Sequence, residues 1–180
     1  MPLDLDAWLP DPQVRTLHRR SAETDADRLW NAAESVRLRD APVLGRAVRW
    51  RIPGTSLDLS FWDLFRQYPF SVIARGARWS VSGMCGRIWT VRRDYPRIDG
   101  AKDFLAWDEP GTARVLLAHW IEGDGEGRSA LVSETRIKPV DGQARLRIRA
   151  LWTLVGHFEP LIGREGLRRA AQRAEQDQAR

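Results

Sequence analysis

The sequence has little of several residue types, and each shortage narrows what the protein can be. Cys85 is the single cysteine among 180 residues, which excludes an intramolecular disulfide and a zinc site built on several cysteines. No apolar run approaches the roughly 18 residues that a membrane-spanning helix needs. Residues 1–6 carry acids where a secretory signal peptide needs basic residues. We therefore expect a cytoplasmic protein without integral membrane association.

Lysine is also scarce, since Lys102 and Lys138 are the only lysines among 29 basic residues. The formal net charge is +5, because 24 acidic residues offset the basic ones. Nucleic-acid-binding proteins usually gather basic residues into one stripe or patch. Here the arginines are spread along the chain, often with acids nearby, which is typical of solvated faces. We expect no nucleic-acid partner.

Tryptophan is the residue type present in unusual number. The nine tryptophans stand at positions 8, 30, 50, 62, 79, 89, 107, 120 and 152. Each can bury a large apolar area and donate one N–H. Their spread over the whole chain indicates a core or cavity wall to which nearly every element contributes. A stacking platform for single-stranded RNA would instead cluster aromatic residues on neighbouring strands.

Hydrophobic periodicity predicts helices and strands over the first two thirds of the chain. Thr24 and Asp25 offer a helix N-cap, and Gly83 and Gly86 predict a bulge or bend in a strand. Residues 57–67 are ambiguous between an edge strand and a short helix. The predicted elements are a polar leader over 1–12, a strand over 14–22, helices over 26–36 and 43–50, strands over 70–75 and 79–89, a loop over 92–102 and a short strand over 103–108.

The last third predicts a hairpin followed by a long helix. Strands over 113–122 and 129–138 are joined by a glycine-rich loop. Asp141 caps a helix over 141–176, which Gly156 and Pro160 should kink near 156–160. Its apolar residues form one stripe: Ala144, Ile148, Leu151, Trp152 and Val155. Strands segregated from helices favour a single α+β domain over 1–180, in which the terminal helix fills the concave face of a curved antiparallel sheet.

The order of the predicted elements and several short sequence segments resemble the SRPBCC (START-like) superfamily. The resemblance is closest to an uncharacterised bacterial branch of about this length. The matching segments span nearly the whole chain and lie at residues 8–10, 14–15, 30–32, 38–40, 86–89, 134–137, 152–158 and 164–168. None of them is a catalytic motif. The resemblance implies a helix-grip fold, in which the sheet wraps around the C-terminal helix and encloses an apolar cavity. Its members bind lipids, sterols, hormones or polyketides, and some cyclise polyketides, so the resemblance leaves the chemistry open.

The candidate catalytic residues are histidines. His18 and His119 lie on predicted strands and could act as general bases, since an unperturbed imidazole titrates near pH 6.5. A structural role in the sheet is the preferred interpretation for both, and His157 lies at the predicted kink. No local spacing of ligands indicates a metal site, and no cofactor is expected.

Glu134 and Arg136 allow two interpretations. Strand alternation places both on one face, where they could bind a polar head group or transfer protons if that face lines the cavity. We prefer the other interpretation, a solvent-exposed pair, because buried charges are costly unless they are paired. Cys85 has no neighbouring base to activate it and is interpreted as a small buried residue.

The sequence favours a binding module over an enzyme. A small hydrophobic or amphipathic molecule, lipid-like or polyketide-like, would lie between the sheet and the terminal helix. The predicted cavity residues are Trp79, Trp89, His119, Trp120, Ile148 and Trp152. The alternative is an enzyme of the polyketide cyclase or dehydratase kind that uses His18 or His119. A third hypothesis, a protein-interaction module using the loop over 92–102, rests on no particular motif.

Overall fold

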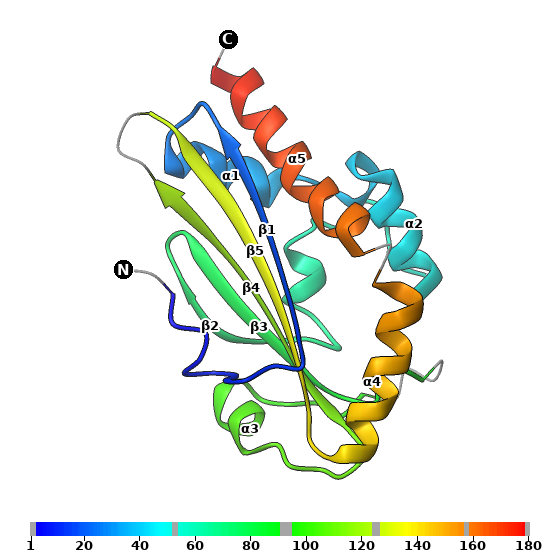
Figure 1. Cartoon of the computed structure of the whole chain (residues 1–180). Helices are drawn as coiled ribbons and strands as arrows, with labels where there is room; N and C mark the ends of the chain where they lie inside the picture. Colours follow the sequence, from blue (N-terminus) through cyan, green and yellow to red (C-terminus); the bar gives the residue numbers. More distant parts are fainter. Residues whose placement is uncertain (1–2, 52–53, 91–94, 124–126, 157–158, 179–180) are drawn as a thin grey trace. The chain divides into compact units, whose positions relative to one another are not determined.

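Five segments form the strands of one antiparallel sheet, with the order β1-β5-β4-β3-β2 (Figure 1). The computed structural model describes residues 3–51, 54–90, 95–123, 127–156 and 159–178. The strands are β1 (Val14–Ala22), β2 (Ser71–Gly76), β3 (Trp79–Gly86), β4 (Ala113–Gly123) and β5 (Ser129–Pro139). The α+β class and the antiparallel sheet that the sequence predicts are thereby confirmed.

The helices flank these strands in the sequence. They are α1 (Ala26–Ser35), α2 (Pro42–Arg51), α3 (Ala101–Ala106), α4 (Gly142–Val155) and α5 (Glu159–Gln178), with short 3-10 helices η1 (Leu38–Asp40) and η2 (Asp63–Phe65). The predicted helix over 141–176 is divided into α4 and α5. Residues 157–158, including His157, lie outside the described residues. No helix among the described residues is long and apolar enough to cross a membrane.

The chain divides into two compact units. Unit 1 comprises residues 1–17, 65–118 and 134–157, and unit 2 comprises residues 18–64, 119–133 and 158–180. The chain passes from one unit to the other within β1, β4 and β5. Each unit has buried residues of its own.

Helix α4 packs its apolar stripe on one face of the strands of unit 1. Asp141 caps the helix, its side chain accepting a hydrogen bond from the Ala144 N–H at 2.7 Å. Ala144 and Ile148, one turn apart, are fully buried. The residues of this hydrophobic cluster are Val14, Met84, Ala113, Val115, Ile137 and Ile148, with Phe70, Ile88, Trp89, Tyr95 and Trp152 partly buried against it. Ala144, Ile148 and Trp152 of the predicted stripe therefore face the strands of unit 1.

The opposite face of the same strands is covered as well. Leu5 and Leu9 are buried although they belong to the predicted polar leader. The backbone carbonyl of Leu9 accepts a hydrogen bond from Arg136 at 3.0 Å. Arg136 and its neighbour Ile137 point to opposite faces of β5. Because Ile137 faces α4, Arg136 and Leu9 lie on the other face. Residues 3–12 are thus part of the packed structure of unit 1, because two leucines at a spacing of four bury themselves against the strands.

The prediction of a strand over 103–108 is wrong, since Ala101–Ala106 is the helix α3. Gly100 has a positive φ of 78° at the N-cap, and Asp103 Oδ2 accepts the Asp99 N–H at 2.8 Å. These features start a helical turn, and Phe104 becomes its single buried residue. A run this short does not distinguish a helix from a strand by periodicity.

Gly83 makes room for α3. A Cβ atom at this position would lie 2.4 Å from the Ile73 Cδ1 and 2.7 Å from the Phe104 ring. The irregularity of this hairpin falls on the partner strand, between Val72 and Ala74, whereas Gly86 ends β3 with a positive φ of 135°. The bulge predicted at the glycines of β3 is therefore not found there, since the register shift lies on β2, and Gly83 instead allows the close approach of Ile73 and Phe104.

Unit 2 is built on three helices and an aromatic cluster. Helix α5 packs against α1 and α2, and its buried residues Leu167, Ala170, Ala171 and Ala174 form one face. Asp25 caps α1 as predicted, accepting the Arg28 N–H at 2.9 Å. The ambiguous segment 57–67 contains both structures in brief form, namely an isolated bridge from Ser60 to Arg37 and the 3-10 helix η2.

Candidate functional site

Three of the predicted cavity residues come together in unit 1. Ile148 of α4 is fully buried in the hydrophobic cluster. Trp89 and Trp152 pack against that cluster and keep part of their surfaces exposed. The guanidinium of Arg147 lies 5.8 Å from the centre of the Trp89 ring, which is within the range of a cation–π contact. This part of the predicted wall therefore presents aromatic surface continuous with the core.

A groove of about 480 Å³ lies beside this wall, between the beginning of β1 and the exposed side of α4. Its volume is within the range of about 300–1,000 Å³ that is common for small-molecule sites. The lining residues come from two elements: Gln13, Val14, Arg145, Leu146, Arg149, Trp152 and Thr153. Val14 and Trp152 also belong to the hydrophobic cluster, so the groove opens onto the apolar core of unit 1.

The groove is amphipathic. Val14, Leu146 and Trp152 provide apolar surface, and Leu146 is 67% exposed. Arg145 and Arg149, one helical turn apart, provide positive charge on the same face of α4. Acidic side chains are absent from the described residues that line it. Gln13 ties the two walls together, since its Nε2 donates to the Arg145 carbonyl at 3.0 Å.

The remaining predicted cavity residues lie elsewhere. Trp79 begins β3, opposite Gly76 in the β2–β3 hairpin, and a Cβ at Gly76 would come within 2.2 Å of the Trp79 Nε1. Trp120 is half-buried in unit 2 and donates from Nε1 to Glu122 Oε1 at 3.2 Å. Neither residue belongs to the cluster of Trp89, Ile148 and Trp152.

The two strand histidines belong to unit 2. His119 is 2% exposed, and its ring lies edge-on to Trp62 with 4.0 Å between the ring centres. The Phe61 ring also packs edge-on against the His119 ring, with 5.5 Å between the ring centres. His18 on β1 is also buried. His119 is thus packed among aromatic rings, and the structural role that the sequence favours for it stays a prediction.

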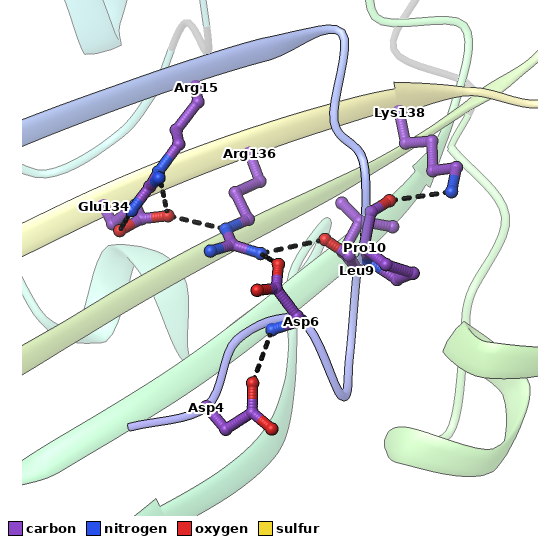
Figure 2. A network of polar contacts seen from close by, with 8 residues as sticks. All are labelled: Asp4, Asp6, Leu9, Pro10, Arg15, Glu134, Arg136 and Lys138. Atoms are coloured by element: carbon purple, nitrogen blue, oxygen red, sulfur yellow. Dashed lines mark hydrogen bonds and ion pairs between the residues drawn. The ribbon is translucent and has the colours of Figure 1, made fainter. Parts of the chain in front are cut away.

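The preferred interpretation of Glu134 and Arg136 as solvent-exposed charges is wrong. Glu134 is 2% and Arg136 is 5% exposed, and Figure 2 shows both within a network of polar contacts. Arg136 Nε donates to Glu134 Oε1 at 2.6 Å, and its Nη1 contacts the Asp6 carboxylate. Burial is tolerated because each charge has a partner, which is the condition that makes buried ions acceptable.

Arg15 on β1 completes this network. Its Nε and Nη2 donate to the two carboxylate oxygens of Glu134 at 2.8 and 3.1 Å, a bidentate arrangement (Figure 2). That hydrogen bonding, together with the attraction of the Glu134 charge, raises the pKa of the Arg15 guanidinium above its ordinary value. Two acids and two arginines balance in formal charge, so the network stabilises the position of residues 3–12 and leaves no net charge for a ligand.

Cys85 occupies the buried position on β3 that the sequence predicts. Cys85 is fully buried, and desolvation raises the pKa of its thiol to about 12, against the opposing effect of Arg114. Among the residues that the structure describes, no group of three or more His, Cys, Asp or Glu residues could hold a metal ion. A thiol held neutral at ordinary pH is not a nucleophile.

Most residues of the groove are not predicted from the sequence, which indicates only Trp152 among them. The sequence pattern indicates solvated faces for the arginines, including those of α4, and does not single out Gln13. The pattern that could have identified the site is Arg145 and Arg149 at a spacing of four on either side of Leu146. That pattern places an apolar residue among cations on the outer side of a helix.

Comparisons with known proteins give distant likenesses only. No protein-family model and no curated protein matches the chain. A crystal structure of a Thermus thermophilus protein is 10% identical, with a TM-score of 0.36 over 89% of this chain and 97% of the other. The Zhui aromatase/cyclase from a Streptomyces species is 15% identical, with a TM-score of 0.34 over 93% and 96%. At TM-scores this low, neither likeness supports a conclusion about this chain.

Proposed function

We propose that the protein is a START-like binding module of the SRPBCC superfamily, which holds a small hydrophobic or amphipathic molecule against α4. The observation that carries this proposal is the groove of about 480 Å³, whose apolar surface continues into the hydrophobic cluster of unit 1. An enclosed internal cavity, with Trp79, His119 and Trp120 in its wall, stays a prediction from the sequence.

The lining of the groove favours an amphipathic acid among these ligands. Trp152 and Leu146 offer contact area for an aliphatic or aromatic body. Arg145 and Arg149 would pair with a carboxylate at one end of the molecule, because guanidinium groups bind carboxylates through charge-assisted hydrogen bonds. A long-chain carboxylate or an aromatic polyketide acid has both parts.

Native mass spectrometry followed by calorimetry tests this proposal. The freshly purified protein is first inspected for a bound small molecule, and then titrated with decanoic acid and with decanol. We expect the acid to bind more tightly than the alcohol. Arg149→Ala should remove that preference, and Trp152→Ala should weaken both ligands about tenfold, which corresponds to about 1.4 kcal/mol.

Arg164→Ala is the control, since Arg164 is an exposed arginine on α5 outside the lining of the groove. Equal affinity for acid and alcohol in the unmodified protein would contradict the role of the arginines. Binding that survives in Trp152→Ala and Leu146→Ala would place the ligand elsewhere and overturn the proposal.

The enzymatic alternative stays a hypothesis. It requires His18 or His119 to reach a substrate, whereas His119 packs against Trp62 and Phe61. Turnover of a polyketide-like substrate that is lost in His119→Ala, with near-native circular dichroism, would favour the enzyme. Unchanged turnover in the double variant His18→Ala, His119→Ala would end the assignment of either residue as a base.

A further inference from the structure

A second groove, of about 420 Å³, lies in unit 2 along the surface of α5. Arg169, Gln172, Arg173 and Gln176 line it from α5. Their spacing of three and four residues places them on one face of the helix. This face adjoins the alanine-rich face that packs against α1 and α2, so the groove is held by rigid elements of the same unit.

The opposite wall comes from the segment between α1 and α2. Val36 is buried at its base, and Arg39, Asp40 and Pro42 complete the lining. The described lining residues thus carry three guanidinium groups and one carboxylate. Their excess of positive charge favours an anion.

Two of the three arginines already have partners. Arg39 Nη1 lies 2.9 Å from the Asp58 carboxylate. Arg173 Nη1 donates to the Ser35 carbonyl at 3.0 Å and lies 3.6 Å from Asp40 Oδ2. Asp40 also accepts the backbone N–H of Arg37 at 3.0 Å. These contacts fix the walls of the groove and offset part of its charge.

Arg169 differs from them. Among the described residues no carboxylate pairs with it, and its Nε is buried without a hydrogen-bond partner. Glu165 lies one turn earlier on α5, but its buried carboxylate accepts the backbone N–H of Leu44 at 2.7 Å. A guanidinium is always charged and presents five donors in a planar fork. A half-buried one without a counter-ion in a groove is suited to an anionic ligand.

We propose that this groove binds the phosphate group of a small phosphorylated metabolite, with Arg169 as its principal ligand and Arg173 beside it. Arginine forks match phosphate oxygens and bind them through two parallel hydrogen bonds. Gln172 and Gln176, further along the same face, would contact hydroxyl groups of the attached polar body. Val36 and Pro42 alone supply apolar surface to the described lining, so the groove offers little to an acyl chain. The inference is independent of the ligand proposed for unit 1.

Calorimetric titration of the full chain with ribose 5-phosphate, inorganic phosphate and ribose tests this inference. We expect saturable binding of the phosphates with one site per chain, tighter for the sugar phosphate than for inorganic phosphate, and none for ribose. Arg169→Ala should weaken binding at least tenfold, and Arg169→Lys should weaken it less. Arg168→Ala, which removes an exposed arginine outside the lining, should leave it unchanged.

Three results would overturn the proposal. Equal losses in Arg168→Ala and Arg169→Ala would indicate diffuse attraction to a basic surface. Failure of both phosphates to saturate the protein at about 10 mM would exclude a phosphate site of useful affinity. Binding to vesicles that contain phosphatidic acid, without binding of the soluble phosphates, would assign the groove to a lipid head group instead. Trp152→Ala should keep phosphate binding, so failure in unit 1 and failure here are distinguishable.

Discussion

Glu134 and Arg136 stand two positions apart on β5 and form a buried ion pair, with 2.6 Å between Glu134 Oε1 and Arg136 Nε. Residues two apart on a strand share a face, so one face of β5 presents both signs of charge. Asp6 and Arg15 then complete the pairing from the N-terminal segment and from β1 (Figure 2). The network therefore joins three parts of the sequence within unit 1.

Glu134→Ala should destabilise the protein by about 3–5 kcal/mol, because it removes the buried counter-charge of Arg136 and leaves only the exposed carboxylate of Asp6. Urea denaturation followed by circular dichroism measures the change in the free energy of unfolding. Glu122→Ala is the control for an exposed carboxylate: it removes the ion pair with Arg19 at 3.0 Å and the hydrogen bond from Trp120 Nε1, and an exposed ion pair is worth about 0–1 kcal/mol. Equal effects of the two substitutions would mean that the buried network contributes no more than a surface pair.

Leu9→Ala should cost about 2–5 kcal/mol, the range for removing a fully buried leucine side chain. Leu9 is 0% exposed, whereas Leu17 on β1 is 52% exposed, and Leu17→Ala should stay within about 0.5 kcal/mol of the unmodified protein. The same denaturation measurement compares them. A negligible cost at Leu9 would show that residues 3–12 are not part of the cooperative fold.

The thiol of Cys85 should not react with Ellman's reagent at pH 8 in the folded protein. Burial raises its pKa to about 12, so the thiolate that reacts is scarce and the sulfur is inaccessible. In guanidinium chloride one thiol per chain should react at once. Rapid reaction without denaturant would contradict the buried position of Cys85 in β3.

Asp141 should make the stability of α4 depend on pH in the acid range. Hydrogen bonds from the backbone N–H groups of Ala144 and Gly111 hold the pKa of this carboxyl below its ordinary value. A lowered pKa in the folded state adds stability above the unfolded value of about 3.9, which is lost as the pH falls toward the folded value.

Melting temperatures measured between about pH 6 and pH 3 test this prediction. Asp141→Asn keeps a side-chain acceptor at the N-cap but does not titrate, so its melting temperature should fall less over this range than that of the unmodified protein. Asp141→Ala should melt lower even at pH 6, because the cap itself is lost. Parallel pH profiles of the unmodified protein and Asp141→Asn would show that this carboxyl does not contribute.

Local patterns were sufficient for most elements because neighbouring residues decide them. Alternation predicted β1, and the glycine-rich loop predicted the hairpin of β4 and β5, each strand to within one residue of its ends. The apolar stripe Ala144–Ile148–Trp152 predicted the buried side of α4. The segments at 101–108 and 57–67 were harder, because they are shorter than the window in which a period can be recognised. In the first of these segments, the positive φ of Gly100 and the burial of Phe104 accompany the helix α3.

The sequence by itself determined the α+β class, the hairpins, the capped helices and the place of Cys85 as a small residue inside a strand, since each depends on spacing or composition along a short stretch. Only the tertiary structure decided where charges and grooves lie. The burial of Glu134 is tolerated because Arg15, 119 positions earlier, pairs with its carboxylate. The groove beside α4 has walls from two distant parts of the sequence, which a hydrogen bond joins between Gln13 and Arg145, 132 positions apart. Such contacts depend on strand register and helix packing, which bring distant residues together and leave no periodic trace in the chain.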